Sequence, residues 1–241
     1  MTIPTANENA SYPEAPVFRS PFRIDRDQTR IFADAATTAA VRDAFARSGG
    51  VVFHDVLDPD LLQHLIERSG KAAFRQVDMQ EHGVRGNDLS VAASLPFCTL
   101  LARAAFLRWL EAISGCEPVT NIEGHLAQMI VGNHVEWHRD GGPGNRRLAM
   151  VLNLTTDAYE GGRFELRRKS TREPMLAYHA NMAGSLAIFP VTRDFQHQVT
   201  RITSGGPRTI FSAWARGSWH EDERDRPIKL ATWPPLAPPM A

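Results

Sequence analysis

The chain has 241 residues, of which 43% are hydrophobic, and its 27 basic residues balance its 27 acidic residues. A chain of this length can form one domain with a substantial core, and the composition is that of a globular protein rather than a disordered one. Surfaces that bind nucleic acid are normally strongly basic, so the balanced charge argues against nucleic acid and leaves a small-molecule or neutral partner open.

The two cysteines, Cys98 and Cys116, are too few and too irregularly placed for a disulfide framework or a thiolate zinc site. The first residues lack the basic cluster and apolar run of a signal peptide, and no stretch has the hydropathy needed to span a bilayer. We therefore expect a cytoplasmic protein without a membrane partner. No pattern predicts its oligomeric state.

Both ends of the chain are rich in proline and lack hydrophobic periodicity, as WPPLAPPMA at the C-terminus illustrates. Segments of this kind have few apolar side chains to bury. We expect a mobile N-terminal tail over residues 1–22 and a C-terminal tail over residues 221–241. A single domain is predicted over residues 23–220.

Helices are predicted in the first half of this domain, with a short strand between two of them. A helical pattern over 38–47 ends at Gly49-Gly50, before the strand-like residues 51–53. Asp58 can cap a second helix, which begins at Pro59 and ends at Gly70.

A third helix is predicted over 97–113, with Leu100, Leu101, Ala104, Ala105 and Leu107 in the core. The polar stretch 79–94, rich in Gly and Asn, resembles a loop that could border a pocket. The helices over about 23–120 are expected to support the rest of the domain.

From Gly124 onward, short β-like runs broken by glycine replace the helical pattern: HLAQMIV, RLAMVLNL, RFELRR, SLAIFP and RTIFSAW. Their spacing is typical of an all-β sandwich. The predicted fold is therefore mainly β with flanking helices, with a jelly-roll (double-stranded β-helix) core over about 121–217. Gly161-Gly162 is predicted to form a turn between strands.

His138 and Asp140 stand two residues apart, so on an extended chain both side chains project to the same face. Together with a distal histidine such a pair forms the two-His-one-carboxylate triad, which leaves open coordination positions on Fe(II). His197 is the candidate for the distal ligand. A His-x-Asp pair alone is a weak signal, because it also occurs by chance.

A second match, His220-Glu221-Asp222, lies in the charged run HEDERDR, with no downstream histidine and no strand pattern around it. We interpret it as solvated surface. Arg208, on the strand-like run after His197, offers a planar guanidinium that can hold a remote carboxylate in two parallel hydrogen bonds.

These motifs, taken in order, resemble the 2-oxoglutarate/Fe(II) oxygenase family, and within it the prolyl-4-hydroxylase-like branch. The resemblance covers residues 124 to 215, somewhat over a third of the chain. The matching stretches are His138-Arg139-Asp140; Leu152-Asn153-Leu154 leading to Gly161-Gly162-Arg163-Phe164; Gly184-Ser185-Leu186-Ala187-Ile188-Phe189-Pro190; His197-Gln198-Val199; and Gly206-Pro207-Arg208 leading to Trp214.

The resemblance implies that His138, Asp140 and His197 ligate Fe(II) and that Arg208 binds the far carboxylate of 2-oxoglutarate. Many members carry a tyrosine about ten residues before the first ligand as a further co-substrate contact. Gln128 stands at that position here, and its amide is the candidate substitute. Related halogenases have Gly or Ala at the carboxylate position, so Asp140 argues for an oxidation without halide.

The resemblance implies a dioxygenase that uses Fe(II), 2-oxoglutarate and O2, releases succinate and CO2, and hydroxylates an unactivated C–H bond of an amino acid or natural-product intermediate. The alternatives are a cupin-type metalloenzyme that does not use 2-oxoglutarate, a peptidyl or prolyl hydroxylase acting on protein, and a non-catalytic binding module. Desaturation, cyclisation and epoxidation share the same oxidant. Segments 71–94 and 164–183 are expected to determine substrate selectivity.

Overall fold

The computed structural model describes residues 11–79, 83–88, 90–140 and 145–218. Four helices occur among these residues: α1 (Ala35–Ser48), α2 (Pro59–Gly70), α3 (Val91–Leu101) and α4 (Ala104–Ser114). The strands are β1 (Val17–Arg19), β2 (Phe22–Ile24), β3 (Thr29–Ile31), β4 (Val51–His54), β5 (Phe74–Asp78), β6 (Gly83–Asp88), β7 (Val119–Met129), β8 (His134–His138), β9 (Arg146–Asn153), β10 (Tyr159–Glu160), β11 (Phe164–Arg168), β12 (Pro174–Tyr178), β13 (Leu186–Pro190), β14 (Phe195–Val199), β15 (Ser204–Gly205) and β16 (Arg208–Gly217).

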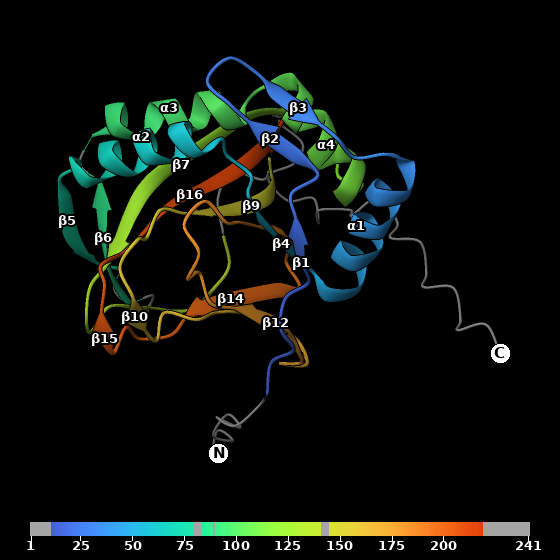
Figure 1. Ribbon diagram of the computed structural model, residues 1–241. Helices are drawn as coiled ribbons and strands as arrows, with labels where there is room; N and C mark the ends of the chain where they lie inside the picture. Colours follow the sequence, from blue (N-terminus) through green and yellow to red (C-terminus); the bar gives the residue numbers. More distant parts are fainter. Residues whose placement is uncertain (1–10, 80–82, 89, 141–144, 219–241) are drawn as a thin grey trace.

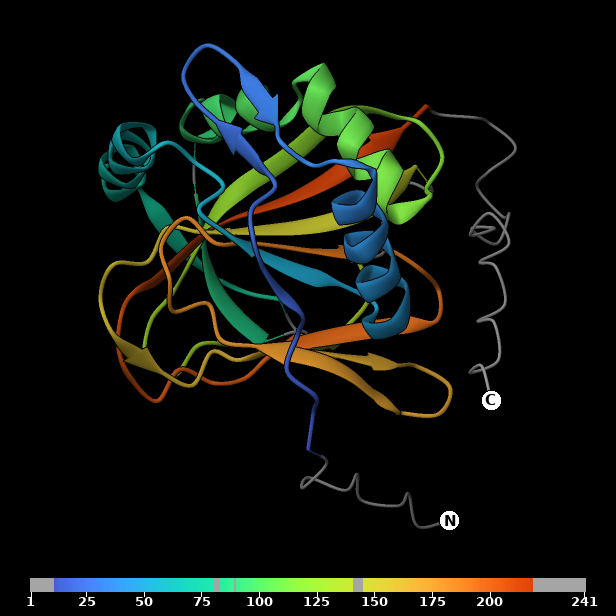
Figure 2. The same ribbon diagram turned by 45° about the vertical axis from the view of Figure 1, so that its right-hand side comes forward.

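Twelve of the described strands form one curled sheet, in the order β1-β4-β13-β9-β16-β7-β6-β8-β14-β11-β12, with β5 paired to β6. The sheet folds back on itself, so that β12 and β14 face β9 and β16 across the interior (Figures 1 and 2). This is the jelly roll that the sequence predicts.

The hydrophobic core consists of two clusters, which lie on opposite faces of the wall that contains β16. This strand contributes residues to both clusters, because neighbouring residues of a strand point to opposite faces. Phe211 and Ala213 pack outward against the helices, while Ile210 packs inside the roll. In Figure 1, α3 and α4 lie over β7 and β16 on the outer face. The helices therefore support the wall whose inner face lines the roll.

The helix α1 and the strand β4 confirm the predictions for residues 38–47 and 51–53. The prediction for α2 is also confirmed. The Asp58 carboxylate accepts a hydrogen bond from the backbone N–H of Asp60, Pro59 is the first helical residue, and the helix ends at Gly70. The sequence rules for the start of a helix thus apply here without change.

The predicted single helix over 97–113 is wrong, because two helices, α3 and α4, meet there at an angle of 69°. Arg103 is extended between them, and its guanidinium donates a hydrogen bond to the Asp25 carbonyl at 2.7 Å. Ala104, expected in the core, is exposed at this bend. Among the described residues no single helix is long and apolar enough to cross a membrane, and α3 and α4 meet that criterion only when taken together.

The stretch 79–94 is not simply a loop, since β6 and the start of α3 lie within it. Gly83 and Gly86 interrupt the residue pattern of β6 and conceal it in the sequence. At Gly86 an added Cβ would meet the Gln128 carbonyl oxygen of β7 at 3.1 Å. Glycine thus allows β6 to pack closely against its neighbour.

Part of the predicted N-terminal tail belongs to the fold. Glu14 bridges to Ala177 at the β12 edge, and β1 then pairs in parallel with β4. Phe22 is 1% exposed in the helix-side core. The prolines of this segment obscure its role in the sequence, because they interrupt the pattern of a strand. An edge strand can nevertheless accommodate proline. The predicted C-terminal tail and His220-Glu221-Asp222 lie outside the described residues.

The turn predicted at Gly161-Gly162 is confirmed, with φ values of 76° and 62°. A Cβ on Gly161 would stand 1.9 Å from the carbonyl oxygen of Arg201, which leaves no room for a side chain. At Gly162 a Cβ would approach the Arg208 side chain at 3.2 Å. This turn therefore packs against the residue predicted to hold the co-substrate.

Replacing Phe22 by Ala should lower the free energy of unfolding by about 3–5 kcal/mol, as expected for a buried phenylalanine. Its ring centroid lies 4.6 Å from that of Trp109 and 5.1 Å from that of Phe106. Urea unfolding measures the change, with Phe32→Ala as the control, since the Phe32 side chain is 62% exposed. Equal effects of the two substitutions would show that the N-terminal segment does not contribute to the core.

Candidate functional site

Two neighbouring strands bring the predicted histidines together. Strands β8 and β14 are antiparallel, and His138 is the direct register partner of His197. Their ring centroids are 4.1 Å apart. Asp140 follows His138 by two residues, so its carboxylate reaches the same side of the sheet. The side chains of Asp140 and His197 are each only 11% exposed.

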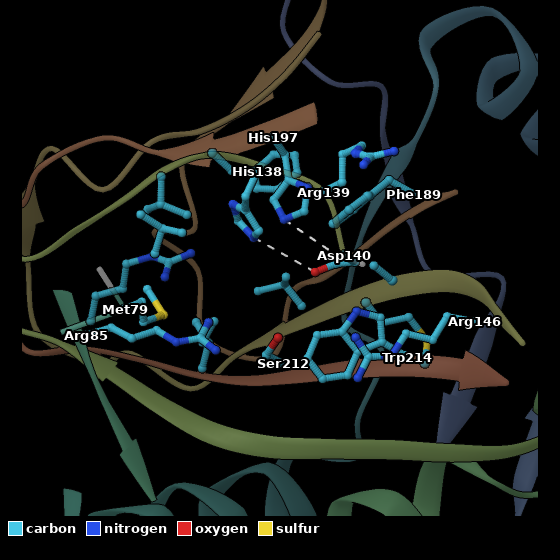
Figure 3. A pocket seen from close by; sticks show the side chains of 18 residues that line it. Met79, Arg85, His138, Arg139, Asp140, Arg146, Phe189, His197, Ser212 and Trp214 are labelled. Carbon is cyan, nitrogen blue, oxygen red and sulfur yellow. Dashed lines mark ion pairs between the residues drawn. The ribbon is translucent and has the colours of Figure 1, made fainter. Parts of the chain in front are cut away.

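The three predicted metal ligands converge on one point. One carboxylate oxygen of Asp140 lies 3.9 Å from His138 Nε2, and the other lies 3.9 Å from His197 Nε2. One ligand atom from each residue lies within 4.8 Å of the others (Figure 3). Two imidazoles and one carboxylate with this spacing form the donor set of a non-haem Fe(II) site. We refer to these three residues as the triad.

Each imidazole of the triad is oriented by its surroundings. His138 Nδ1 lies 2.8 Å from the Glu136 carbonyl oxygen. Donation of Nδ1–H to this carbonyl sets the tautomer in which the Nε2 lone pair can ligate a metal. His197 packs between the rings of Phe164 and Phe189, with centroids 5.4 and 5.1 Å away. Burial lowers the pKa of His197 to about 4, so its ring is neutral at neutral pH.

The triad faces a cavity of about 400 Å³ inside the roll, within the size range of small-molecule sites. In Figure 3, Arg85 and Met79 lie on one side of this cavity and Trp214 with Arg146 on the other. The remaining wall is largely apolar: apart from Arg139, Arg208 and Ser212 it consists of Val135, Ala149, Met150, Val151, Phe164, Phe189, Val199 and Ile210. We call this space the cavity.

Arg208 lines the cavity and is 1% exposed. Its Nη1 lies 3.5 Å from the weak acceptor Sδ of Met129, and its Nε has no hydrogen-bond partner in the described part of the chain. Nearby Tyr159 and Tyr178 have pKa values raised by burial, an effect that the charge of Arg208 opposes. A buried guanidinium without a carboxylate partner among the described residues fits a site for an anionic ligand.

The expected co-substrate contact of Gln128 does not agree with the structure. Residues Ala127 and Met129 of β7 point into the roll, so the intervening Gln128 lies on the opposite face. Gln128 is not among the residues that line the cavity, and its amide donates to the Thr209 hydroxyl at 3.3 Å. The strand alternation therefore excludes it from the site, although its spacing in the sequence is suitable.

The sequence analysis missed Arg85, which lines the cavity from β6. It lies in the stretch expected to be a loop, and only the recognition of β6 as an inner strand could have placed it. Its Nη2 is 3.0 Å from Nε2 of His125, a residue that no motif includes. Burial, and then the charges of Arg85 and Arg146, lower the pKa of His125 to about 4, so the neutral ring accepts this hydrogen bond.

The comparison with protein families agrees with this geometry. Residues 124–216 match the model of the 2OG-Fe(II) oxygenase superfamily, where 2OG denotes 2-oxoglutarate. The match covers somewhat over a third of the chain. Together with the geometry of the triad, it supports a 2-oxoglutarate-dependent dioxygenase, with Fe(II) as cofactor and 2-oxoglutarate and O2 as co-substrates, as the resemblance in the sequence implies.

Solved structures of oxygenases share this fold. A 2OG-Fe(II) oxygenase family oxidoreductase from Burkholderia pseudomallei is 14% identical, with a TM-score of 0.61, over 84% of this chain and 95% of that one. A prolyl-4-hydroxylase from Pseudomonas putida is 19% identical, with a TM-score of 0.55, over 75% of this chain and 99% of that one.

A Trichoplax adhaerens prolyl hydroxylase, solved with a peptide fragment of hypoxia inducible factor, is 11% identical, with a TM-score of 0.52, over 75% of this chain and 89% of that one. The expected prolyl-4-hydroxylase-like fold is thus confirmed. Comparison with curated protein sequences gave no significant match.

His125→Gln should weaken the pH dependence of stability of the oxygenase between about pH 6.5 and 4. The folded-state pKa of His125 lies below its unfolded value, so the unfolded chain binds the extra proton and stability falls as the pH drops through this range. Removing the group should reduce the slope of unfolding free energy against pH, by at most about 1.4 kcal/mol per pH unit. Urea unfolding at several pH values measures it, and an unchanged slope would contradict the buried neutral state.

Proposed function

We propose that His138, Asp140 and His197 hold the Fe(II) of this oxygenase. The convergence of their ligand atoms within 4.8 Å carries this proposal. The role of the chain is to fix the donors: the Glu136 carbonyl orients His138, and the two phenylalanine rings restrict His197. Donors held in this way need little rearrangement to bind a metal.

Arg208 is the proposed partner of the far carboxylate of 2-oxoglutarate. It lies in the same cavity as the triad, and its buried guanidinium has no carboxylate partner in the described ranges. A planar guanidinium binds a carboxylate through two parallel hydrogen bonds. Gly162, in the turn described above, packs against its side chain.

When bound, Fe(II) with 2-oxoglutarate and O2 supplies the oxidation, and succinate and CO2 are released. The protein orients the co-substrate through Arg208 and surrounds the reacting region with apolar side chains, among them Phe189 and Ile210. Exclusion of water strengthens the polar contacts inside the cavity and limits side reactions. Because Asp140 fills the carboxylate position, the proposed outcome is hydroxylation of a C–H bond without halide.

The proposed substrate is a small molecule, an amino acid or a natural-product intermediate. The volume of about 400 Å³ lies near the lower end of the range for small-molecule sites, and the co-substrate must share this space. A peptidyl substrate is the second candidate, since two of the similar structures are prolyl hydroxylases.

Anaerobic addition of Fe(II) and then 2-oxoglutarate to the metal-free protein should produce the visible band of an iron–keto acid chelate. His138→Ala should lose the band, because a ligand is removed. Metal binding by the wild type without a band would favour a cupin-type site that does not use 2-oxoglutarate.

Arg208→Gln should weaken 2-oxoglutarate binding by about tenfold or more, since a buried charge-assisted contact is lost. Titration of the visible band with 2-oxoglutarate gives the apparent affinity. Gln128→Ala is the matched control from the neighbouring strand and should leave that affinity unchanged, because Gln128 faces away from the cavity. Equal losses in both variants would contradict the assignment of Arg208.

A further inference from the structure

A second arginine of the cavity, Arg85, forms no ion pair with another described residue. Its guanidinium approaches His125 Nε2 at 3.0 Å, but no carboxylate in the described part of the chain forms an ion pair with it. Burial lowers the pKa of Arg85, and the neighbouring charge of Arg208 adds to this effect while Asp140 opposes it. Arg85 therefore remains a partly desolvated cation that faces a ligand space.

The charges of the loaded site leave the positive charge of Arg85 uncompensated. Fe(II), the Asp140 carboxylate, dianionic 2-oxoglutarate and the Arg208 guanidinium together carry no net charge, with both imidazoles of the triad neutral. Arg146, which also lines the cavity, is already paired with Glu123 at 2.8 Å. Arg139 is exposed. The positive charge of Arg85 is therefore in excess inside the cavity.

The strand register separates Arg85 from the proposed co-substrate anchor. Arg208 pairs with Met129 on one side of β7, and the Gly86–Gln128 pair sets Arg85 beside Met129 on the other side. Two strand spacings, roughly 10 Å, thus separate the two arginine backbones. The two arginines therefore approach the cavity from different strands.

The hydrogen bond to His125 draws the Arg85 guanidinium along β7 toward the level of Ser212, which is the register partner of His125. Figure 3 shows Arg85 extending into the cavity toward Ser212, on the side opposite the triad. The Arg85 side chain thus runs from the level of Met129, where the Arg208 backbone pairs, toward the level of His125.

We propose that Arg85 binds a carboxylate of the organic substrate, so that the enzyme oxidises a small carboxylic acid. The proposal rests on the proposed function, because it places this acid beside the 2-oxoglutarate held by Arg208. The acid would supply the missing negative charge, while its carbon skeleton would contact the apolar wall formed by Val151, Ile210 and Trp214. Neutral His125 holds the guanidinium in place without cancelling its charge.

The first experiment separates Arg85 from the co-substrate site. Wild type, Arg85→Gln and Arg208→Gln are each titrated anaerobically with 2-oxoglutarate after Fe(II) loading. Arg85→Gln should keep the visible band and an apparent affinity within about threefold of wild type, whereas Arg208→Gln should lose about tenfold or more. An equal loss in Arg85→Gln would assign Arg85 to 2-oxoglutarate and overturn the proposal.

The second experiment tests recognition of a carboxylate. Hexanoate, phenylacetate, L-leucine and L-phenylalanine, each with its carboxamide, are added to the anaerobic Fe(II)–2-oxoglutarate enzyme, and the shift of the visible band is measured. At least one acid should bind about tenfold or more tightly than its amide, and Arg85→Gln should abolish this preference. Parallel aerobic assays of succinate release should show the same preference.

Two further variants serve as controls. Arg85→Lys, which keeps the charge but not the planar fork, should retain part of the preference for the acid. Arg146→Gln should retain it fully, because Glu123 already neutralises Arg146.

Amides that bind as well as acids, or no acid that shifts the band at all, would overturn the substrate proposal while the chelate band still supports the proposed function. Absence of the chelate band in wild type would instead indicate failure of the proposed function itself.

Discussion

The site depends on the antiparallel pairing of β8 with β14. This pairing places His138 opposite His197, and the short step to Asp140 completes the donor set. A shift of the register by one residue would turn one imidazole to the other face of the sheet and separate the donors. The curled wall of the roll then surrounds the triad and excludes most of the solvent, with the side chains of all three residues less than one-fifth exposed.

Charge organises the interior as much as apolar packing does. Two arginines, the half-buried Arg85 and the buried Arg208, enter the cavity from strands on opposite sides of β7, so its positive charges stand at two separate positions. An arginine keeps its charge even when it is desolvated, whereas a buried lysine would shift its pKa and lose it. The cavity is therefore suited to hold anions at two separate places.

Sequence reasoning predicted the parts of the fold that local rules determine. The cap at Asp58 and the strands after Gly124 correspond to the structure, and the motif residues His138 and Arg208 line one cavity. Sequence reasoning was wrong where tertiary contacts determine which way a side chain points or where a strand lies. Gln128 had the expected spacing but faces away from the cavity, and β6 was hidden because its glycines allow close packing against β7. Arg85 could not be identified before β6 had been placed.

The N-terminal segment joins the two free edges of the curled sheet. Glu14 bridges to Ala177 on β12 and forms an ion pair with Arg163, and β1 pairs in parallel with β4. These pairings join residues that are far apart in the sequence, and such contacts form slowly because the intervening chain must first be ordered. The seam between Glu14 and Ala177 therefore closes only after the chain has been made through β12. Closure of the roll thus depends on a contact between its first and its later residues.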